Sequence, residues 1–178
     1  SQFFKIENIL KVSKVSELKL KPLRKLESNS NFIELNKLVK NNKGSHEQYL
    51  FLTNNGRWEG YIDEKILKSV SIKKWDRSFV VDFKKSIKKF ANVNDNDELW
   101  RTIEKLEKTK DGIVLVINPA NLPVGILDRK KIGYFVFNKL GINLPTNIIS
   151  KFNNKNQYPL GIDLPGIIKL MRKKGDIE

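Results

Sequence analysis

The sequence predicts an α/β (α+β) fold in which one structural unit occurs twice. Two segments share the same order of features: a short apolar stretch, a polar turn, a second apolar stretch with an internal glycine, and an aspartate. The first copy spans residues 49–63 and the second spans residues 114–128, so that Gly60 falls on Gly125 and Asp63 on Asp128. Helical spacings of apolar residues lie before and after each copy, which predicts a helix–strand–strand–helix unit.

Each copy is predicted to form an antiparallel hairpin. Asn55-Gly56 tolerates the positive φ of a tight turn in the first copy, and Asn118-Pro119 is a turn signal in the second. Gly60 and Gly125 lie inside strands, where glycine often marks the close approach of another backbone. We therefore expect a neighbouring chain segment beside each glycine.

The helices are predicted from apolar spacing and capping residues. Asn31 is a candidate N-cap before the first hairpin, and Asp63 and Asp128 are candidate N-caps after the two hairpins. A more extended stretch precedes each unit, at residues 15–26 and 78–93. The four apolar stripes are Phe32, Leu35, Leu38 and Val39; Ile66, Leu67 and Val70; Leu99, Trp100, Ile103 and Leu106; and Ile132, Phe135, Val136 and Leu140.

The repeat predicts the domain organisation. We expect a first unit at residues 12–72, a second unit at residues 73–141 and a C-terminal tail at residues 142–178. The tail should end in a helix, because Asp163 and Pro165 suit a helix start and Arg172-Lys173-Lys174 suits a helix end.

Composition bounds the function. The chain has 178 residues, of which 39% are hydrophobic, so it can bury a core. It contains no apolar run near the roughly 20 residues of a membrane helix. The absence of cysteine excludes disulfides and zinc ribbons, and His46 is the only histidine. Ser1 in place of an initiator methionine favours an excised fragment of a longer protein.

The formal net charge of +14 has two interpretations. One is binding to nucleic acid or to an anionic membrane surface. The other is compositional bias, because only six of the 34 basic residues are arginine, the side chain that grips phosphate at two points. The second interpretation is favoured, which disfavours nucleic acid and leaves the membrane surface open. The segment Asp82 to Phe90 is expected to be a basic surface helix with its apolar face in the core.

The repeated order resembles the cystathionine-β-synthase (CBS) domain, a module that occurs in tandem pairs about a pseudo-twofold axis. Gly60-Tyr61-Ile62-Asp63 and Gly125-Ile126-Leu127-Asp128 carry the match, which covers residues 12–140. The resemblance implies a regulatory module without catalytic or metal-binding residues. It also implies a homodimer and an adenosine-containing ligand in the cleft between the units.

Both copies depart from the CBS ligand pattern. That pattern has Ser or Thr where this chain has Asp63 and Asp128, and a ribose-binding Asp where it has Ile66 and Lys131. An N-cap Asp occupies the N–H groups that would hold a phosphate, and one lost charge-assisted bond costs roughly 10- to 100-fold in affinity. Adenine-nucleotide binding is therefore disfavoured, although nearby basic residues could compensate. The candidate ligand-binding residues are Asp63, Lys65, Asp128, Arg129 and Lys131.

Other motifs resemble the C-terminal region of cyanobacterial site-2 protease-like proteins, which are intramembrane zinc metalloproteases. The matching residues are Gly56-Arg57-Trp58, Trp75-Asp76, Leu140 to Pro145, and Tyr158-Pro159-Leu160-Gly161. The protease signature is His-Glu-x-x-His, and His46-Glu47 lacks its second histidine, so any zinc would lie in an absent protease part.

This second resemblance implies a regulatory appendage on the cytoplasmic side of a membrane protease, which would be its attached partner. One alternative is a stand-alone CBS protein that senses adenine nucleotides or dimerises. A weaker alternative is a basic binder of nucleic acid or of a membrane surface.

Overall fold

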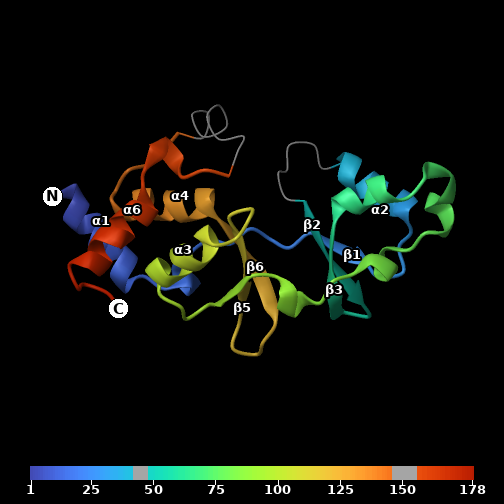
Figure 1. Ribbon diagram of the computed structural model, residues 1–178, viewed down its shortest axis with the longest axis horizontal. Coiled ribbons are helices and arrows are strands. Elements are labelled where there is room, and N and C mark those ends of the chain that lie inside the picture. The colour runs from blue at the N-terminus through green and yellow to red at the C-terminus, as the bar shows by residue number, and fades with distance from the viewer. Residues whose placement is uncertain (42–47, 146–155) are drawn as a thin grey trace. The chain divides into compact units, whose positions relative to one another are not determined.

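The structure is a computed structural model that describes residues 1–41, 48–145 and 156–178 (Figure 1). The chain divides into two compact units. One consists of Leu23–Phe90 and is called the inserted unit here; the other consists of Ser1–Pro22 with Ala91–Glu178 and is called the terminal unit. Each unit has its own three-stranded sheet and its own helices, which confirms the predicted α/β class.

The inserted unit contains the first copy of the repeat. Its sheet has the order β1-β2-β3, with β1 parallel to β2 and β2 antiparallel to β3. The hairpin turn has φ values of 51° at Asn55 and 79° at Gly56, as the turn sequence predicted. The elements are β1 (Lys25–Glu27), α2 (Phe32–Asn41), β2 (Tyr49–Asn54), β3 (Arg57–Asp63) and the 3₁₀ segments η2 (Glu64–Ser69), η3 (Ile72–Arg77), η4 (Val80–Phe83) and η5 (Ile87–Lys89).

The terminal unit contains the second copy and repeats the same sheet. Its strand order is β4-β5-β6, again with one parallel and one antiparallel pair. The elements are α1 (Gln2–Val12), η1 (Val15–Glu17), β4 (Asn92–Asn94), α3 (Leu99–Glu107), β5 (Ile113–Ile117), β6 (Pro123–Asp128), α4 (Arg129–Lys139), η6 (Pro159–Gly161) and α6 (Leu164–Lys173). Helices α1, α3 and α6 pack on one another, and α1 also contacts α4 (Figure 1).

Both internal glycines lie where an extended segment crosses the hairpin. A Cβ on Gly60 would lie 2.6 Å from the carbonyl oxygen of Lys85, and one on Gly125 would lie 2.7 Å from Cβ of Leu20. The backbone of Lys85 pairs with Tyr61, and that of Lys21 pairs with Ile126. The predicted close approach is confirmed in both copies, and it brings Lys21 beside the end of β6.

Each unit has a separate hydrophobic core. In the inserted unit, Phe32 and Leu35 of α2 pack against Leu50, Leu52 and Ile62 of the hairpin. In the terminal unit, the core includes the final helix, whose buried residues are Leu164, Ile168 and Met171. The predicted C-terminal helix is confirmed as α6, and Asp163 caps it by accepting a 3.0 Å hydrogen bond from the Gly166 N–H.

The helix expected after Asp63 is instead the 3₁₀ segment η2. The Ser69 hydroxyl donates to the Ile66 carbonyl at 2.5 Å, and the Trp75 indole N–H donates to the Val70 carbonyl at 2.9 Å. Val70 is extended, with φ of −126° and ψ of 134°. The segment ends after six residues because the backbone leaves the helical conformation at Val70.

The prediction of a helix at Asp82 to Phe90 is also wrong. The structure has two short 3₁₀ turns there, η4 and η5, separated by an extended segment. The N–H and the carbonyl of Lys85 each bond to Tyr61 at 2.9 Å. A residue whose two backbone groups pair with a strand cannot also join a helical ladder, so the tertiary pairing overrides the helical spacing.

Candidate functional site

Asp128 organises the start of α4 in the terminal unit. One carboxylate oxygen accepts a 2.9 Å hydrogen bond from the Lys131 N–H, which confirms the predicted N-cap. The other lies 2.6 Å from the Lys21 ammonium. Asp128 is only 3% exposed, so this pair neutralises a buried charge. The Lys21 strand pairing described above places the ammonium there.

A hollow of about 500 Å³ lies along α4, from Lys131 near this cap to Lys139 at the end of the helix. Its walls combine ammonium groups with aromatic and amide groups, a combination that suits an anionic ligand with an apolar or aromatic body. Lys139 and Glu17 form an ion pair of 3.7 Å within this wall. This hollow is called the lysine-lined hollow here, and its lining residues are Glu17, Lys19, Lys131, Tyr134, Phe135, Asn138 and Lys139.

Positive charge is in excess around the hollow. Burial lowers the pKa of Lys131, the Lys19 ammonium lowers it further, and Asp128 opposes the shift. Burial also lowers the pKa of Lys130, which Lys21 lowers further. Both shifts mean that the folded protein disfavours a proton on these lysines. A bound anion would reverse this effect, because it stabilises each ammonium and reduces their mutual repulsion.

The N-terminus of α4 itself is filled by the C-terminal tail. The Arg129 N–H donates to the Asn156 side-chain oxygen at 2.8 Å, and the Lys131 N–H is taken by Asp128. The Asn156 amide in turn donates to the carbonyls of Asp111 and Gly112, both at 2.8 Å. A phosphate at this helix end would therefore have to displace two bonds that the chain makes internally.

The Arg129 guanidinium is committed to the same network. It donates to both carboxylate oxygens of Glu107, at 2.7 and 3.1 Å, and to the Asn156 carbonyl at 3.2 Å. The Tyr158 hydroxyl donates to Glu107 at 3.0 Å. The hydrogen bond with Glu107 raises the pKa of Arg129, and burial together with the Glu107 charge raises the pKa of Tyr158. A ligand-binding role for Arg129 stays a prediction.

The inserted unit contains the corresponding cap at Asp63. Its carboxylate accepts a 2.9 Å bond from the Lys65 N–H and a 3.0 Å bond from the Gln48 side chain. The Lys65 side chain is exposed, while Ile66 packs against the core. The predicted site residues thus fall into two groups: Asp63 and Lys65 in the inserted unit, and Asp128, Arg129 and Lys131 in the terminal unit. A ligand role for either group stays a prediction.

Lys19 and Lys21 were not among the predicted site residues. Their signal was the alternation Lys19-Leu20-Lys21, which puts both ammonium groups on one side of an extended stretch and Leu20 on the other. Gly125 predicted the close approach of another segment, but only the fold shows that this segment contains Leu20 and Lys21.

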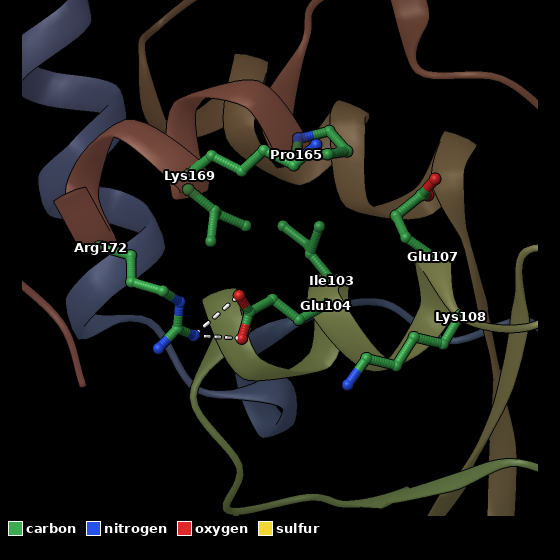
Figure 2. Close-up of a pocket in the computed structure, with 8 residues that line it drawn as sticks. Ile103, Glu104, Glu107, Lys108, Pro165, Lys169 and Arg172 are labelled. Carbon is green, nitrogen blue, oxygen red and sulfur yellow. Dashed lines mark hydrogen bonds and ion pairs between the residues drawn. The ribbon is translucent and has the colours of Figure 1, made fainter.

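A second hollow of about 370 Å³ lies between α3 and α6, with Ile103 on its floor (Figure 2). One Arg172 nitrogen donates to both oxygens of Glu104, at 2.6 and 2.8 Å. Glu107 is paired with Arg129, so both carboxylates of this hollow are already neutralised. Lys108 and Lys169 leave this hollow positively charged as well, but its lining contains no aromatic side chain, whereas Tyr134 and Phe135 line the first hollow.

Metal binding has no site in the described part of the chain. Residues 1–41, 48–145 and 156–178 contain no group of three or more His, Cys, Asp or Glu side chains placed to hold a metal ion. His46-Glu47 lies outside the described residues. Among the helices that are described, none combines the length and apolar character needed to cross a membrane.

Comparison with known proteins shows the fold. No family model matches the chain, and no curated sequence matches it. The CBS domain of a bacterial CNNM/CorC family Mg²⁺ transporter in complex with ATP is similar in structure, with a TM-score of 0.60 and 13% identity over 80% of this chain and 97% of that chain. CBSX2, a CBS-pair protein from Arabidopsis thaliana, has a TM-score of 0.57 and 16% identity over 73% and 98%.

CbpB in complex with c-di-AMP is a third similar structure, with a TM-score of 0.59 and 16% identity over 79% of this chain and 95% of that chain. The chain therefore has the fold of a CBS-domain pair, as the repeat and its glycines predicted. At these identities the likeness establishes the fold and leaves the ligand to be argued from the residues.

Proposed function

We propose that this chain is a regulatory CBS module that is not itself catalytic and that binds an anionic ligand in the lysine-lined hollow of the terminal unit. The supporting observation is that Lys19, Lys131 and Lys139 line this hollow with one acidic residue, Glu17, and that Lys21 and Lys130 add positive charge near Asp128 at the start of α4. Burial and mutual repulsion disfavour the charged forms of Lys130 and Lys131. An anion is the ligand that relieves this cost.

An adenine nucleotide fits this hollow better than the bare CBS sequence pattern suggests. Its phosphates would form ion pairs with Lys19 and Lys131, and its base would pack against the aromatic side chains of Tyr134 and Phe135. Similar structures were solved with ATP and with c-di-AMP. Lys131 would contact phosphate where the CBS pattern places a ribose-binding Asp, so phosphate would contribute more of the affinity than ribose.

Calorimetry with ATP, AMP and c-di-AMP tests the proposal. The Lys19→Gln/Lys131→Gln variant should bind the preferred nucleotide at least about tenfold more weakly, because each lost ammonium–phosphate bond is worth at least about 1.5 kcal/mol. The control is Lys5→Gln/Lys11→Gln, which removes the same charge from exposed positions of α1. Absence of binding by the unsubstituted protein, or equal loss in the control, would contradict the proposal.

Attachment to a membrane protease is a finer proposal that rests on sequence motifs alone. In this proposal the chain is a regulatory appendage of a site-2 protease-like zinc metalloprotease, on the cytoplasmic side of the membrane. The genomic reading frame around this chain is the test. Several upstream apolar spans and a His-Glu-x-x-His motif would support it, whereas an initiator codon directly before Ser1 would contradict it.

A homodimer is a further part of the proposal, because CBS pairs commonly associate in twos. Light scattering coupled to size-exclusion chromatography measures the mass directly. A mass of twice 20.7 kDa supports the dimer, and a concentration-independent monomer contradicts it.

A further inference from the structure

The segment that follows β3 in the inserted unit, residues 64–77, forms a strongly basic surface. Its apolar side chains face inward, where Ile66, Leu67, Val70 and Trp75 pack against the core. Both of its 3₁₀ segments, drawn in green after β3, contact α2 (Figure 1). The outward side therefore carries the charged residues, in positions that the core fixes.

The charges on the outward side are not balanced. The two acidic residues of the segment are already paired, Glu64 with Arg24 at 3.3 Å and Asp76 with Arg77 at 3.4 Å. Four exposed lysines have no carboxylate within ion-pair distance among the described residues. These are Lys65, Lys68, Lys73 and Lys74, and with Ile72 they are called the basic surface here.

Ile72 is the most exposed large apolar side chain of the described residues, at 74%. It lies at the start of η3, directly before Lys73 and Lys74. A single exposed apolar residue is ordinary on a protein surface. Ile72, however, lies among four lysines without a carboxylate partner among the described residues. An apolar side chain flanked by ammonium groups suits the boundary between lipid headgroups and acyl chains.

We propose that the basic surface docks on an anionic lipid membrane. The four lysines would lie over the phosphates of the headgroups, and Ile72 would enter the interfacial region between them. Lysine suits this arrangement, because its methylene stem can lie along apolar material while its ammonium stays in a polar layer.

A lipid surface fits better than a nucleic acid for two reasons. The arginines that could grip phosphate at two points, Arg24 and Arg77, are paired with carboxylates. Trp75, the only aromatic residue of residues 64–77, is half-buried with its indole N–H bonded to the Val70 carbonyl, so it is not available to stack on a base.

Vesicle binding tests this proposal. The protein should bind vesicles of phosphatidylcholine that contain phosphatidylglycerol, and should not bind pure phosphatidylcholine. Salt should weaken the binding, because the screening length falls to about 8 Å at physiological ionic strength. The variant Lys65→Gln/Lys68→Gln/Lys73→Gln/Lys74→Gln should lose at least about tenfold in affinity. Ile72→Ser should lose affinity while keeping the same dependence on salt.

The matched control is Lys5→Gln/Lys11→Gln/Lys105→Gln/Lys110→Gln, which removes the same charge from exposed positions of the terminal unit. Equal loss in this control would assign the binding to net charge and overturn the proposal. Absence of vesicle binding at low salt would overturn it as well. So would tighter binding to duplex DNA that the basic-surface variant abolishes.

If the fourfold variant unfolds by circular dichroism, the pairs Lys65→Gln/Lys68→Gln and Lys73→Gln/Lys74→Gln replace it, and each should show part of the loss. Nucleotide titration of the same variants separates this proposal from the ligand proposal. The basic surface lies outside the lysine-lined hollow, so nucleotide affinity should stay unchanged when vesicle affinity falls.

Discussion

At the scale of single residues, the two aspartates at equivalent positions of the repeat are expected to contribute differently to stability. Asp128 is 3% exposed, caps a regular α-helix and pairs with Lys21 at 2.6 Å. Asp63 caps a six-residue 3₁₀ segment and is partly exposed. Removing Asp128 therefore loses a cap and leaves an unpaired ammonium at the edge of the core, whereas removing Asp63 loses little more than a cap.

Asp128→Ala should lower the free energy of unfolding by about 2–4 kcal/mol, from the lost cap and the unpaired Lys21. Asp128→Asn should recover about 1 kcal/mol of this loss, because asparagine also caps helices. Asp63→Ala is the matched comparison and should cost about 1 kcal/mol or less. Urea unfolding measures all three values. Equal losses at the two aspartates would show that the Lys21 pair contributes nothing.

The raised pKa of Tyr158 predicts that the free energy of unfolding depends on pH in the alkaline range. Burial is the main cause of its raised pKa, and the Glu107 charge adds to it. Above about pH 10 the unfolded chain releases the phenolic proton while the folded protein retains it. The folded state then binds more protons, so the free energy of unfolding falls as pH rises, by up to about 1.4 kcal/mol per pH unit.

Tyr158→Phe isolates this effect. At pH 7 the variant should be less stable by about 1 kcal/mol, because the hydrogen bond to Glu107 is lost. Above pH 10 the difference should shrink and then change sign, because phenylalanine has no proton to lose. Chemical unfolding across this range measures the difference. A difference that stays constant with pH would contradict the assigned pKa shift.

At the scale of elements, the final helix is part of the terminal unit's core. The buried face of α6 consists of Leu164, Ile168 and Met171, which join residues of α1 and α3 in one cluster. Its last turn is fixed by ion pairs from Arg172 to Glu104 and from Lys174 to Glu7. A tail that looked separable in the sequence is therefore part of the same core as α1 and α3.

Ile168→Ala should cost about 2–4 kcal/mol of unfolding free energy, because Ile168 is 1% exposed and its removal leaves a cavity between α3 and α6. Leu170→Ala on the same helix is the control and should change stability by less than about 0.5 kcal/mol, because Leu170 is 48% exposed. Urea unfolding gives both values. A loss at Ile168 as small as that at Leu170 would mean that α6 is only loosely packed on the core.

At the scale of the whole molecule, charge is the dominant property. The net charge of +14 destabilises the compact state through self-repulsion, and salt screens this repulsion. The thermal midpoint should therefore rise by about 2–4 °C between low and moderate sodium chloride, which corresponds to about 1 kcal/mol of relieved repulsion. The fourfold glutamine variants should rise less. A midpoint that is independent of salt would show that the lysines are too far apart to interact.

The parts of the fold that the sequence predicted are those that local chemistry decides. The hairpin turn at Asn55-Gly56 and the cap at Asp128 depend on residues within a few positions of one another. The repeat added one longer-range inference, the close approach at Gly60 and Gly125, because a glycine at the same place in both copies marks a crowded backbone. Of the candidate site residues, Lys131 lines the hollow and Asp128 caps the helix that carries it, and a ligand role for both stays a prediction.

What the sequence alone determined is the repeated unit, its antiparallel hairpin and the class of fold, because apolar period and turn residues act over short distances. The tertiary structure alone decided which partners the polar groups obtained. It pairs Lys21 with Asp128, bonds Asn156 to the first N–H of α4 and pairs Glu107 with Arg129. It also turned the expected helices after Asp63 and at Asp82 into 3₁₀ turns. The physical reason is that burial and hydrogen-bond pairing join residues far apart in the chain, and no local pattern specifies these pairings.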